Sequence, residues 1–271
     1  TPPQTTKSPA TTAVVAVLAF SGIVVSLMQT LVIPIIPHLP EYLNAPASDT
    51  AWAVTATLLA AAVAVPTMGR LGDMFGKRRL LLISMALLVT GSVVGALSSS
   101  VIPLVAGRIL QGLAAGVIPL GISVMRDVLP PKKLAGAVAM MSASLGVGGA
   151  LGLPIAALIA EYADWHVLFW VTTAIGLSVT LAAVLFIRES EPNPSGRFDG
   201  VGAVGLSAAM IALLVPITQG SSWGWTSGAV ISMLAASAVL FYTDEPTNFK
   251  FRANRREIVH PYDAGKGFQV I

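Results

Sequence analysis

The chain has 271 residues, of which 55% are hydrophobic and 11% are charged, with a formal net charge of +3 and a mean hydropathy of +0.79. Soluble globular domains carry about 25% charged residues, so this composition excludes a water-soluble fold and indicates a protein embedded in a lipid bilayer. The absence of cysteine excludes disulfides, thiol catalysis and cysteine-ligated zinc.

Apolar segments follow one another along the chain, and we expect about eight of them to cross the bilayer as α-helices. A span needs about 17–25 apolar residues, and inside lipid a helix satisfies all of its backbone hydrogen bonds internally. The predicted fold is therefore an all-α transmembrane bundle. Its spans are predicted at residues 13–36, 51–68, 80–97, 102–124, 135–160, 167–187, 201–218 and, with the weakest pattern, 229–242.

Basic residues predict how the bundle is oriented. Fifteen of the 16 Lys and Arg residues lie outside the spans, in the N-terminal segment, in the tail and in the loops after spans two, four and six. The loops after spans one, three, five and seven contain none. Under the positive-inside rule this alternation predicts cytoplasmic N- and C-termini in a multi-pass plasma-membrane protein. The pI near 9.4 therefore reflects topology, and the expected surroundings are a lipid bilayer, without a nucleic-acid partner.

These spans divide the chain into five predicted regions. They are a cytoplasmic N-terminus (1–12), a six-helix bundle (13–187), a cytoplasmic linker (188–200), two additional helices (201–242) and a polar cytoplasmic tail (243–271). Because the chain starts at Thr1 rather than at Met, we expect it to be a processed, trimmed or partial chain.

The segment between spans two and three is rich in glycine and charge. It contains Gly69, Asp73, Gly76, Lys77 and Arg78. The glycines allow the chain to bend and helix ends to approach closely, and the carboxylate of Asp73 can accept hydrogen bonds from a helix N-terminus or from a nearby arginine. A basic, glycine-rich turn that merely obeys the positive-inside rule explains the segment equally well.

Arg108 is the ionisable side chain that we place within the hydrocarbon. Burying an arginine there costs about 2.5–3.5 kcal/mol, so we expect it to face the bundle interior or a water-filled cavity. Arg108 and Gln29 both lie about 9–10 Å below the outer ends of their spans, by the 1.5 Å rise of a helix. Gln111 shares the helical face of Arg108. The guanidinium could bond Gln29, or it could bond backbone carbonyls of span one as structural support.

Small residues recur in spans four and five. Gly112 and Gly116 are four apart, and Gly148, Gly152 and Pro154 follow in span five. Small residues at this spacing allow close helix contact, and proline frees a carbonyl and bends a helix. The pattern is consistent with helix packing alone as well as with a hinge.

An enzyme is not predicted. The spans contain no Ser/His/Asp set and no paired carboxylates that could form an active site. The three histidines are far apart and lack the spacing of metal ligands, so neither a metal nor a cofactor is expected.

Taken in order, these motifs resemble the major facilitator superfamily, in particular its fourteen-helix drug:proton antiporter branch. The loop from Gly69 to Arg79 is similar to the signature between helices two and three of that superfamily. The segment with Arg108, Gln111 and Gly112 resembles the helix-four motif assigned to proton handling, and 148–154 resembles the helix-five antiporter motif, with the proline shifted. The stretches 196–200 and 223–225 resemble the flanks of helix seven in the fourteen-helix branch.

The resemblance implies a transporter that exports small amphipathic compounds by alternating access. It implies 3+3 inverted repeats in the six-helix bundle, a conformational role for the Gly69–Arg79 segment, and a place for Arg108, Gln29 and Gln111 in the transport pathway or in proton handling.

Two features depart from the family pattern. Met28 and Ile33 occupy places in helix one where the branch carries an acidic or amide residue, and the spans contain no carboxylate, so the coupling ion stays open. The second six-helix bundle is also missing from the sequence, and alternating access needs two bundles. We therefore expect either a half that works with a missing C-terminal bundle or a second copy, or a non-transporting membrane protein.

Overall fold

The computed structural model describes residues 9–189 and 200–255. It divides into two compact units, Thr1–Phe198 and Asp199–Ile271, which are described separately below. Residues 1–8 of the predicted N-terminus, 190–199 of the linker and 256–271 of the tail therefore fall outside the described residues, as does all but the last residue of the stretch 196–200.

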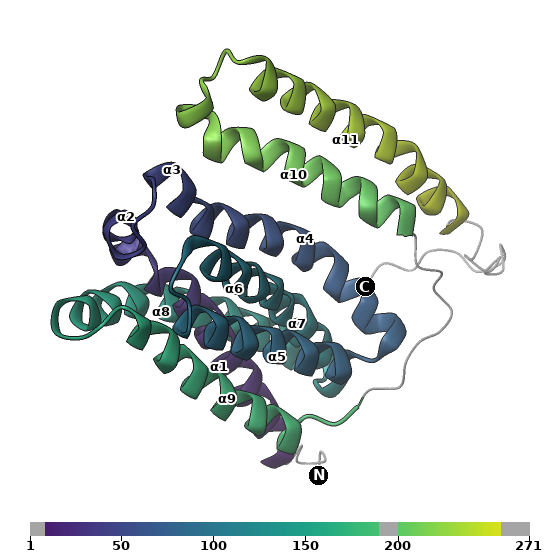
Figure 1. The fold of residues 1–271 in the computed structure, drawn as a ribbon. Helices are drawn as coiled ribbons and strands as arrows, with labels where there is room; N and C mark the ends of the chain where they lie inside the picture. The colour runs from purple at the N-terminus through teal and green to yellow at the C-terminus, as the bar shows by residue number, and fades with distance from the viewer. Residues whose placement is uncertain (1–8, 190–199, 256–271) are drawn as a thin grey trace, which may run out of the picture. The chain divides into compact units, whose positions relative to one another are not determined.

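Every element of the described residues is helical (Figure 1). In chain order the first unit consists of α1 (Pro9–Leu31), η1 (Ile33–His38), α2 (Leu39–Tyr42), α3 (Ala47–Thr50), α4 (Trp52–Phe75), α5 (Lys77–Ala96), α6 (Val101–Leu113), η2 (Ala114–Gly116), α7 (Val117–Val128), α8 (Pro131–Tyr162) and α9 (His166–Phe186). The second unit consists of α10 (Gly200–Trp223) and α11 (Gly228–Arg255).

Helix length and hydropathy make the chain a multi-pass membrane protein. Within the described residues, 7 helical segments are long and apolar enough to cross a bilayer, and Gly228–Thr243 is a shorter apolar helix. The all-α transmembrane fold is thereby confirmed. In the segment Val101–Val128 the short 3-10 turn η2 lies between α6 and α7, where the sequence predicted one uninterrupted span.

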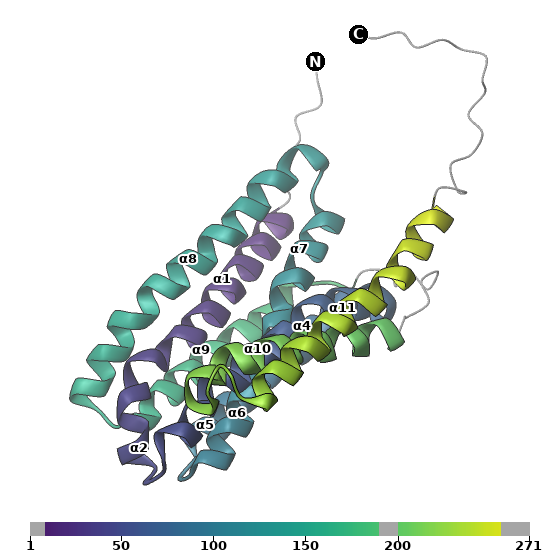
Figure 2. The same cartoon turned by 90° about the horizontal axis from the view of Figure 1, so that it is seen from above.

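The first unit contains six of the 7 membrane-spanning segments and is called the six-helix unit below. Its helices pair in a pattern that agrees with 3+3 inverted repeats. If α1, α4 and α5 correspond to α6–α7, α8 and α9, then the contact of α1 with α8 corresponds to the contact of α6 with α4. The contact of α1 with α9 likewise corresponds to that of α6 with α5. All four contacts are present, and Figure 2 shows α1 running alongside α8.

Glycines set the distance between these paired helices. A Cβ added at Gly148 or Gly152 of α8 would collide with the backbone or side chains of α1, and one added at Gly112 would meet the Thr57 carbonyl and the Cβ of Ala60 on α4. Gly116 packs in the same way against Met68 of α4. The helix backbones therefore approach closely, as small residues permit in membrane bundles.

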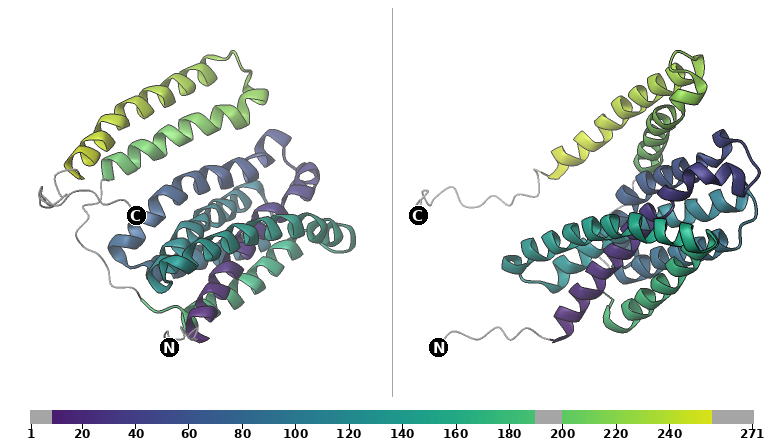
Figure 3. Two further views of the ribbon diagram at one scale, coloured as in Figure 1. Left: turned by 180° about the vertical axis from the view of Figure 1, so that it is seen from behind. Right: turned by 90° about the vertical axis from the view of Figure 1, so that its left-hand side faces the viewer.

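The second unit is a helical hairpin (Figure 3). The chain turns between α10 and α11 at Gly224, whose φ of +84° suits glycine. The Ser237 hydroxyl of α11 donates to the Ala209 carbonyl of α10 at 3.0 Å. Helix α11 continues to Arg255, whereas the sequence predicted its end at residue 242.

Candidate transport and conformational sites

A buried polar network occupies the interior of the six-helix unit. Arg108 of α6 is 2% exposed, and Gln111 is fully buried. The Arg108 Nε donates to the Ala53 carbonyl of α4 at 3.2 Å, and its Nη1 donates to the Met28 carbonyl of α1 at 3.4 Å and to Gln111 Oε1 at 2.8 Å. The guanidinium therefore joins three helices through neutral acceptors.

The network extends to a fourth helix. Gln111 Nε2 donates to the hydroxyl of Ser92 on α5 at 2.9 Å, and that hydroxyl donates to the Leu88 carbonyl at 2.8 Å. Ser92 is fully buried. The side chains thus form one directed chain of hydrogen bonds from Arg108 to α5.

This geometry decides between the two contacts with span one that were predicted for Arg108. Within the described residues its guanidinium makes no hydrogen bond to the half-buried Gln29 side chain, and the contact with α1 is made to the neighbouring carbonyl of Met28. The side chain is 2% exposed and therefore faces the bundle interior, which was one of its two expected surroundings. Adjacent residues of a helix differ by about 100° in direction, so equal depth did not decide which atom faces Arg108.

The segment Gly69–Arg79 is a junction of two helices rather than a loop. Helix α4 ends at Phe75 and α5 begins at Lys77, so Gly76, with φ +98°, is the residue between them. Asp73 consequently lies on the last turn of α4, and Lys77 on the first turn of α5. The abrupt change of direction requires the left-handed backbone region that favours glycine.

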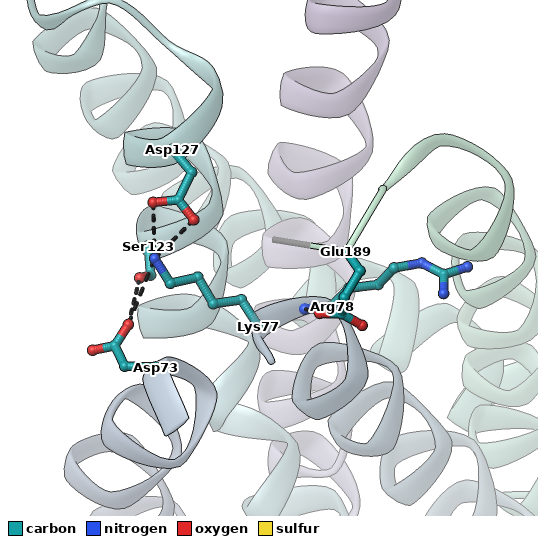
Figure 4. Close-up of polar contacts among 6 residues, drawn as sticks. All are labelled: Asp73, Lys77, Arg78, Ser123, Asp127 and Glu189. Atoms are coloured by element: carbon teal, nitrogen blue, oxygen red, sulfur yellow. Dashed lines mark hydrogen bonds and ion pairs between the residues drawn. The ribbon is translucent and has the colours of Figure 1, made fainter. Parts of the chain in front are cut away.

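Charged side chains gather on one side of this junction (Figure 4). Lys77 Nζ lies 2.8 Å from both carboxylate oxygens of Asp127 on α7 and 3.5 Å from Asp73 Oδ1. The Ser123 hydroxyl, also on α7, donates to Asp73 at 3.4 Å. Lys77 thus lies between two carboxylates, and the cluster connects α4, α5 and α7.

On its other side the junction connects to the end of α9. Arg78 Nε donates to the Ile187 carbonyl at 2.6 Å and its Nη2 to the Val184 carbonyl at 3.0 Å, which satisfies carbonyls that a helix end leaves free. The backbone N–H of Arg78 donates to Glu189 at 3.2 Å. A Cβ at Gly76 would lie 2.7 Å from a carboxylate oxygen of Glu189, so the glycine also makes room for that side chain (Figure 4).

Comparison with known proteins assigns this architecture to a family. Residues 18–266 match the family model described as Major Facilitator Superfamily. The chain belongs to the Major Facilitator Superfamily. The chain is 31% identical over 226 residues to a tetracenomycin C resistance and export protein of Streptomyces glaucescens, covering 83% of this chain and 42% of that protein. It is 30% identical over 195 residues to a probable actinorhodin transporter of Streptomyces coelicolor, covering 70% of this chain and 34% of that protein.

Solved structures of two transporters share this fold. The human organic anion transporter MFSD10 aligns with a TM-score of 0.62 at 20% identity, over 76% of this chain and 55% of that one. A D-xylose–proton symporter aligns with a TM-score of 0.59 at 15% identity, over 90% and 69%. The chain thus spans less than half the length of the two curated relatives and little more than half of the transporter MFSD10. Members of this superfamily are transporters, and the chain is not an enzyme.

In this Major Facilitator Superfamily chain, the structure also brings together residues that the sequence analysis did not select. Ser92 completes the buried network, and Ser123, Asp127 and Glu189 complete the charged junction. Asp127 had a sequence signal, since it is an acidic residue in a basic segment. Ser92 had none, because serine is common in membrane helices and its partner comes from another span.

Proposed function

We propose that the chain forms part of an exporter of small amphipathic compounds. The observation that carries this proposal is the 31% identity, over 83% of the chain, to a protein named for resistance and export. The similarity to a probable actinorhodin transporter and, at 25% identity, to multidrug resistance protein 3 of Bacillus subtilis supports it. We place the protein in the plasma membrane with both termini in the cytoplasm, because basic residues are confined to alternate loops.

The six-helix unit would supply one wall of the transport pathway. In alternating access two bundles rock about a central site, so a second six-helix bundle, on the same chain or on another, would supply the opposite wall. The hairpin of α10 and α11 would be the additional helix pair of a fourteen-helix transporter.

Within the six-helix unit we assign different roles to two sites. The junction at Gly76 rests on exposed ion pairs that water can replace, so we assign to Asp73, Lys77 and Arg78 the control of the equilibrium between conformations. Arg108 and Gln111 sit deeper, and we assign them the task of holding α1, α4, α5 and α6 in register during the motion. A proton carrier would have to lie outside this network, because its hydrogen-bonding members include no carboxylate.

Dye efflux from intact cells tests export. Cells that produce the complete transporter containing this chain would be loaded with a panel of amphipathic fluorescent dyes, and we expect faster efflux than from cells that do not produce it. A parallel culture producing residues 1–271 alone tests the requirement for a second bundle. Efflux equal to that of the non-producing cells for every dye would contradict the export proposal.

The alternative function, a half-bundle that acts without transporting, makes a different prediction in the same assay. In that case neither the complete protein nor the 271-residue chain would export any dye, although both would be present in the membrane. If the complete protein exports a dye and the 271-residue chain alone does not, the result would favour the two-bundle exporter.

A further inference from the structure

We propose that Ser92 is a positioning residue that sets the orientation of Arg108 through the amide of Gln111. The inference rests on the directed hydrogen bonds among these three side chains. For its consequence in transport it also rests on the proposed function, whereas the orientation itself is testable without any transport measurement.

The direction of each hydrogen bond in the network is forced by chemistry. A guanidinium carries donors and no acceptor, so Gln111 must turn its amide oxygen toward Arg108. Its NH2 group then points away, toward α5, where the Ser92 hydroxyl accepts at 2.9 Å. That hydroxyl in turn donates to the Leu88 carbonyl. No member can reverse its role without leaving a donor facing a donor.

Ser92 reaches Gln111 because α5 and α6 touch at their backbones. A Cβ added at Gly91 would lie 2.5 Å from the Gly107 carbonyl oxygen and 2.9 Å from the Gln111 nitrogen, and one added at Gly107 would lie 2.7 Å from the Gly91 carbonyl oxygen. Gly91 directly precedes Ser92, and Gly107 lies four residues, about one helical turn, before Gln111. The close approach thus brings a short serine side chain within hydrogen-bond distance of an amide on the neighbouring helix.

Loss of the Ser92 hydroxyl would leave the Gln111 amide with an unsatisfied donor. Both side chains are fully buried, so water is not there to replace the hydroxyl, and a buried unsatisfied donor is costly. The amide could relieve this by rotating, but rotation would turn its NH2 group toward Arg108. Ser92 therefore keeps the amide oxygen available to the guanidinium.

A double-mutant cycle in the purified full chain tests the proposal. We would measure the unfolding equilibrium in detergent micelles for Ser92→Ala in two backgrounds, the unmodified chain and the Gln111→Glu variant. Glutamate keeps an acceptor for Arg108 but has no NH2 group that needs the hydroxyl. We expect Ser92→Ala to raise the unfolding equilibrium constant about tenfold in the unmodified chain and about two- to threefold at most in the Gln111→Glu background.

Ser21→Ala is the matched control. Ser21 is fully buried in α1, and its hydroxyl donates to the carbonyl four residues earlier, as that of Ser92 does. We expect its effect to be small and equal in the two backgrounds. If Ser92→Ala does not fold, recovery of folding in the double variant with Gln111→Glu supports the proposal, and failure to recover contradicts it. An equal effect of Ser92→Ala in both backgrounds would also overturn it, because simple packing gives that result.

Dye efflux by the complete protein tests whether Ser92 also affects transport. Ser92→Ala should lower the maximal rate of dye efflux several-fold and leave the dye concentration at half-maximal rate unchanged, and Gln111→Glu should restore part of the rate. If the unmodified protein exports no dye, the proposed function fails while the unfolding cycle still decides the role of Ser92. Normal efflux by Ser92→Ala would contradict its link to function.

Discussion

The two polar sites of the six-helix unit, the Arg108 network and the Gly76 junction, differ in how far their charges are exposed to solvent. Around Arg108 a permanent charge is enclosed by protein, 2% exposed, and every hydrogen-bonded acceptor is a neutral dipole. At the Gly76 junction Lys77 lies between two carboxylates, and the side chains of Asp73 and Asp127 are 59% and 33% exposed. The first site has no solvent to replace its contacts, whereas solvent reaches the carboxylates of the second.

This difference predicts different roles. Exposed ion pairs contribute about 0–1 kcal/mol to stability, so the junction can break and reform at little cost, as a switching contact must. Hydrogen bonds enclosed in the bundle are lost only when helices separate, so the Arg108 network holds one arrangement of α1, α4, α5 and α6. Arg108→Ala and Asp73→Asn test this contrast directly, and Gly148→Ala and Asp164→Ala test two other contacts whose expected effects on stability lie between them.

Arg108→Ala should have the largest effect. Truncation leaves a cavity where three helices meet and orphans the Gln111 amide oxygen, for which we expect a loss of about 2–4 kcal/mol in unfolding free energy and of at least about tenfold in efflux. Arg108→Lys should be milder but still impaired, because an ammonium lacks the planar fork. Arg108→Met fills the cavity without donors, so stability equal to that of the unmodified chain would assign the effect to packing alone.

Gly148→Ala should come next. A new Cβ would lie 2.9 Å from the Cβ of Ser26 and 3.0 Å from the Leu27 nitrogen of α1, and such overpacking costs about 1–3 kcal/mol. Gly146→Ala on the same helix is the control, because no atom lies within 4 Å of its added Cβ. Thermal unfolding of both variants measures the difference, and equal unfolding temperatures would show that α1 and α8 do not approach as described.

Asp164→Ala should have a smaller effect, at the start of α9. The Asp164 carboxylate accepts from the backbone N–H of His166 at 2.8 Å and contacts the His166 ring, and the backbone hydrogen bond in particular lowers its pKa. Because the folded pKa lies below the unfolded one, this stabilisation is complete above the ordinary Asp pKa and is lost as pH falls through the lowered value.

We therefore expect the unfolding temperatures of Asp164→Ala and the unmodified chain to differ at neutral pH and to converge in strong acid. Asp164→Asn, which keeps an acceptor for the helix N-terminus, should retain most of the stability at neutral pH. A difference between Asp164→Ala and the unmodified chain that grows on acidification would contradict the assignment.

Asp73→Asn should have the smallest effect on stability. Its ion pair with Lys77 spans 3.5 Å at an exposed position, so we expect a change below about 1 kcal/mol. Efflux should nevertheless fall several-fold while substrate affinity stays nearly unchanged, because the contact acts on the equilibrium between conformations. Lost affinity with a normal maximal rate would assign Asp73 to the substrate site instead.

Hydropathy and charge in the sequence predicted the fold more completely than they predicted the side-chain contacts within it. The lengths of apolar segments identified the membrane helices, because lipid demands long runs of apolar residues. The same signal does not report rotation about a helix axis. It therefore could not decide that the Met28 carbonyl, and not the Gln29 side chain, accepts the hydrogen bond from Arg108. Hydropathy also ended span two at residue 68 and began span three at residue 80, whereas α4 extends to Phe75 and α5 begins at Lys77. The glycine-rich motif marked the segment, but not that Gly76 alone separates the two helices. Ser92 depends on the glycine contact between two helices, which follows from tertiary packing.

The contrast between the two sites is tested most directly by measuring unfolding temperature and dye efflux on the same preparations of four proteins. These are the complete transporter, Asp73→Asn, Arg108→Ala and the double variant. We predict that Asp73→Asn loses efflux at an unchanged unfolding temperature, that Arg108→Ala loses both, and that the double variant unfolds at the temperature of Arg108→Ala. An Asp73→Asn variant that loses stability as Arg108→Ala does, or an Arg108→Ala variant that keeps both stability and efflux, would contradict the account.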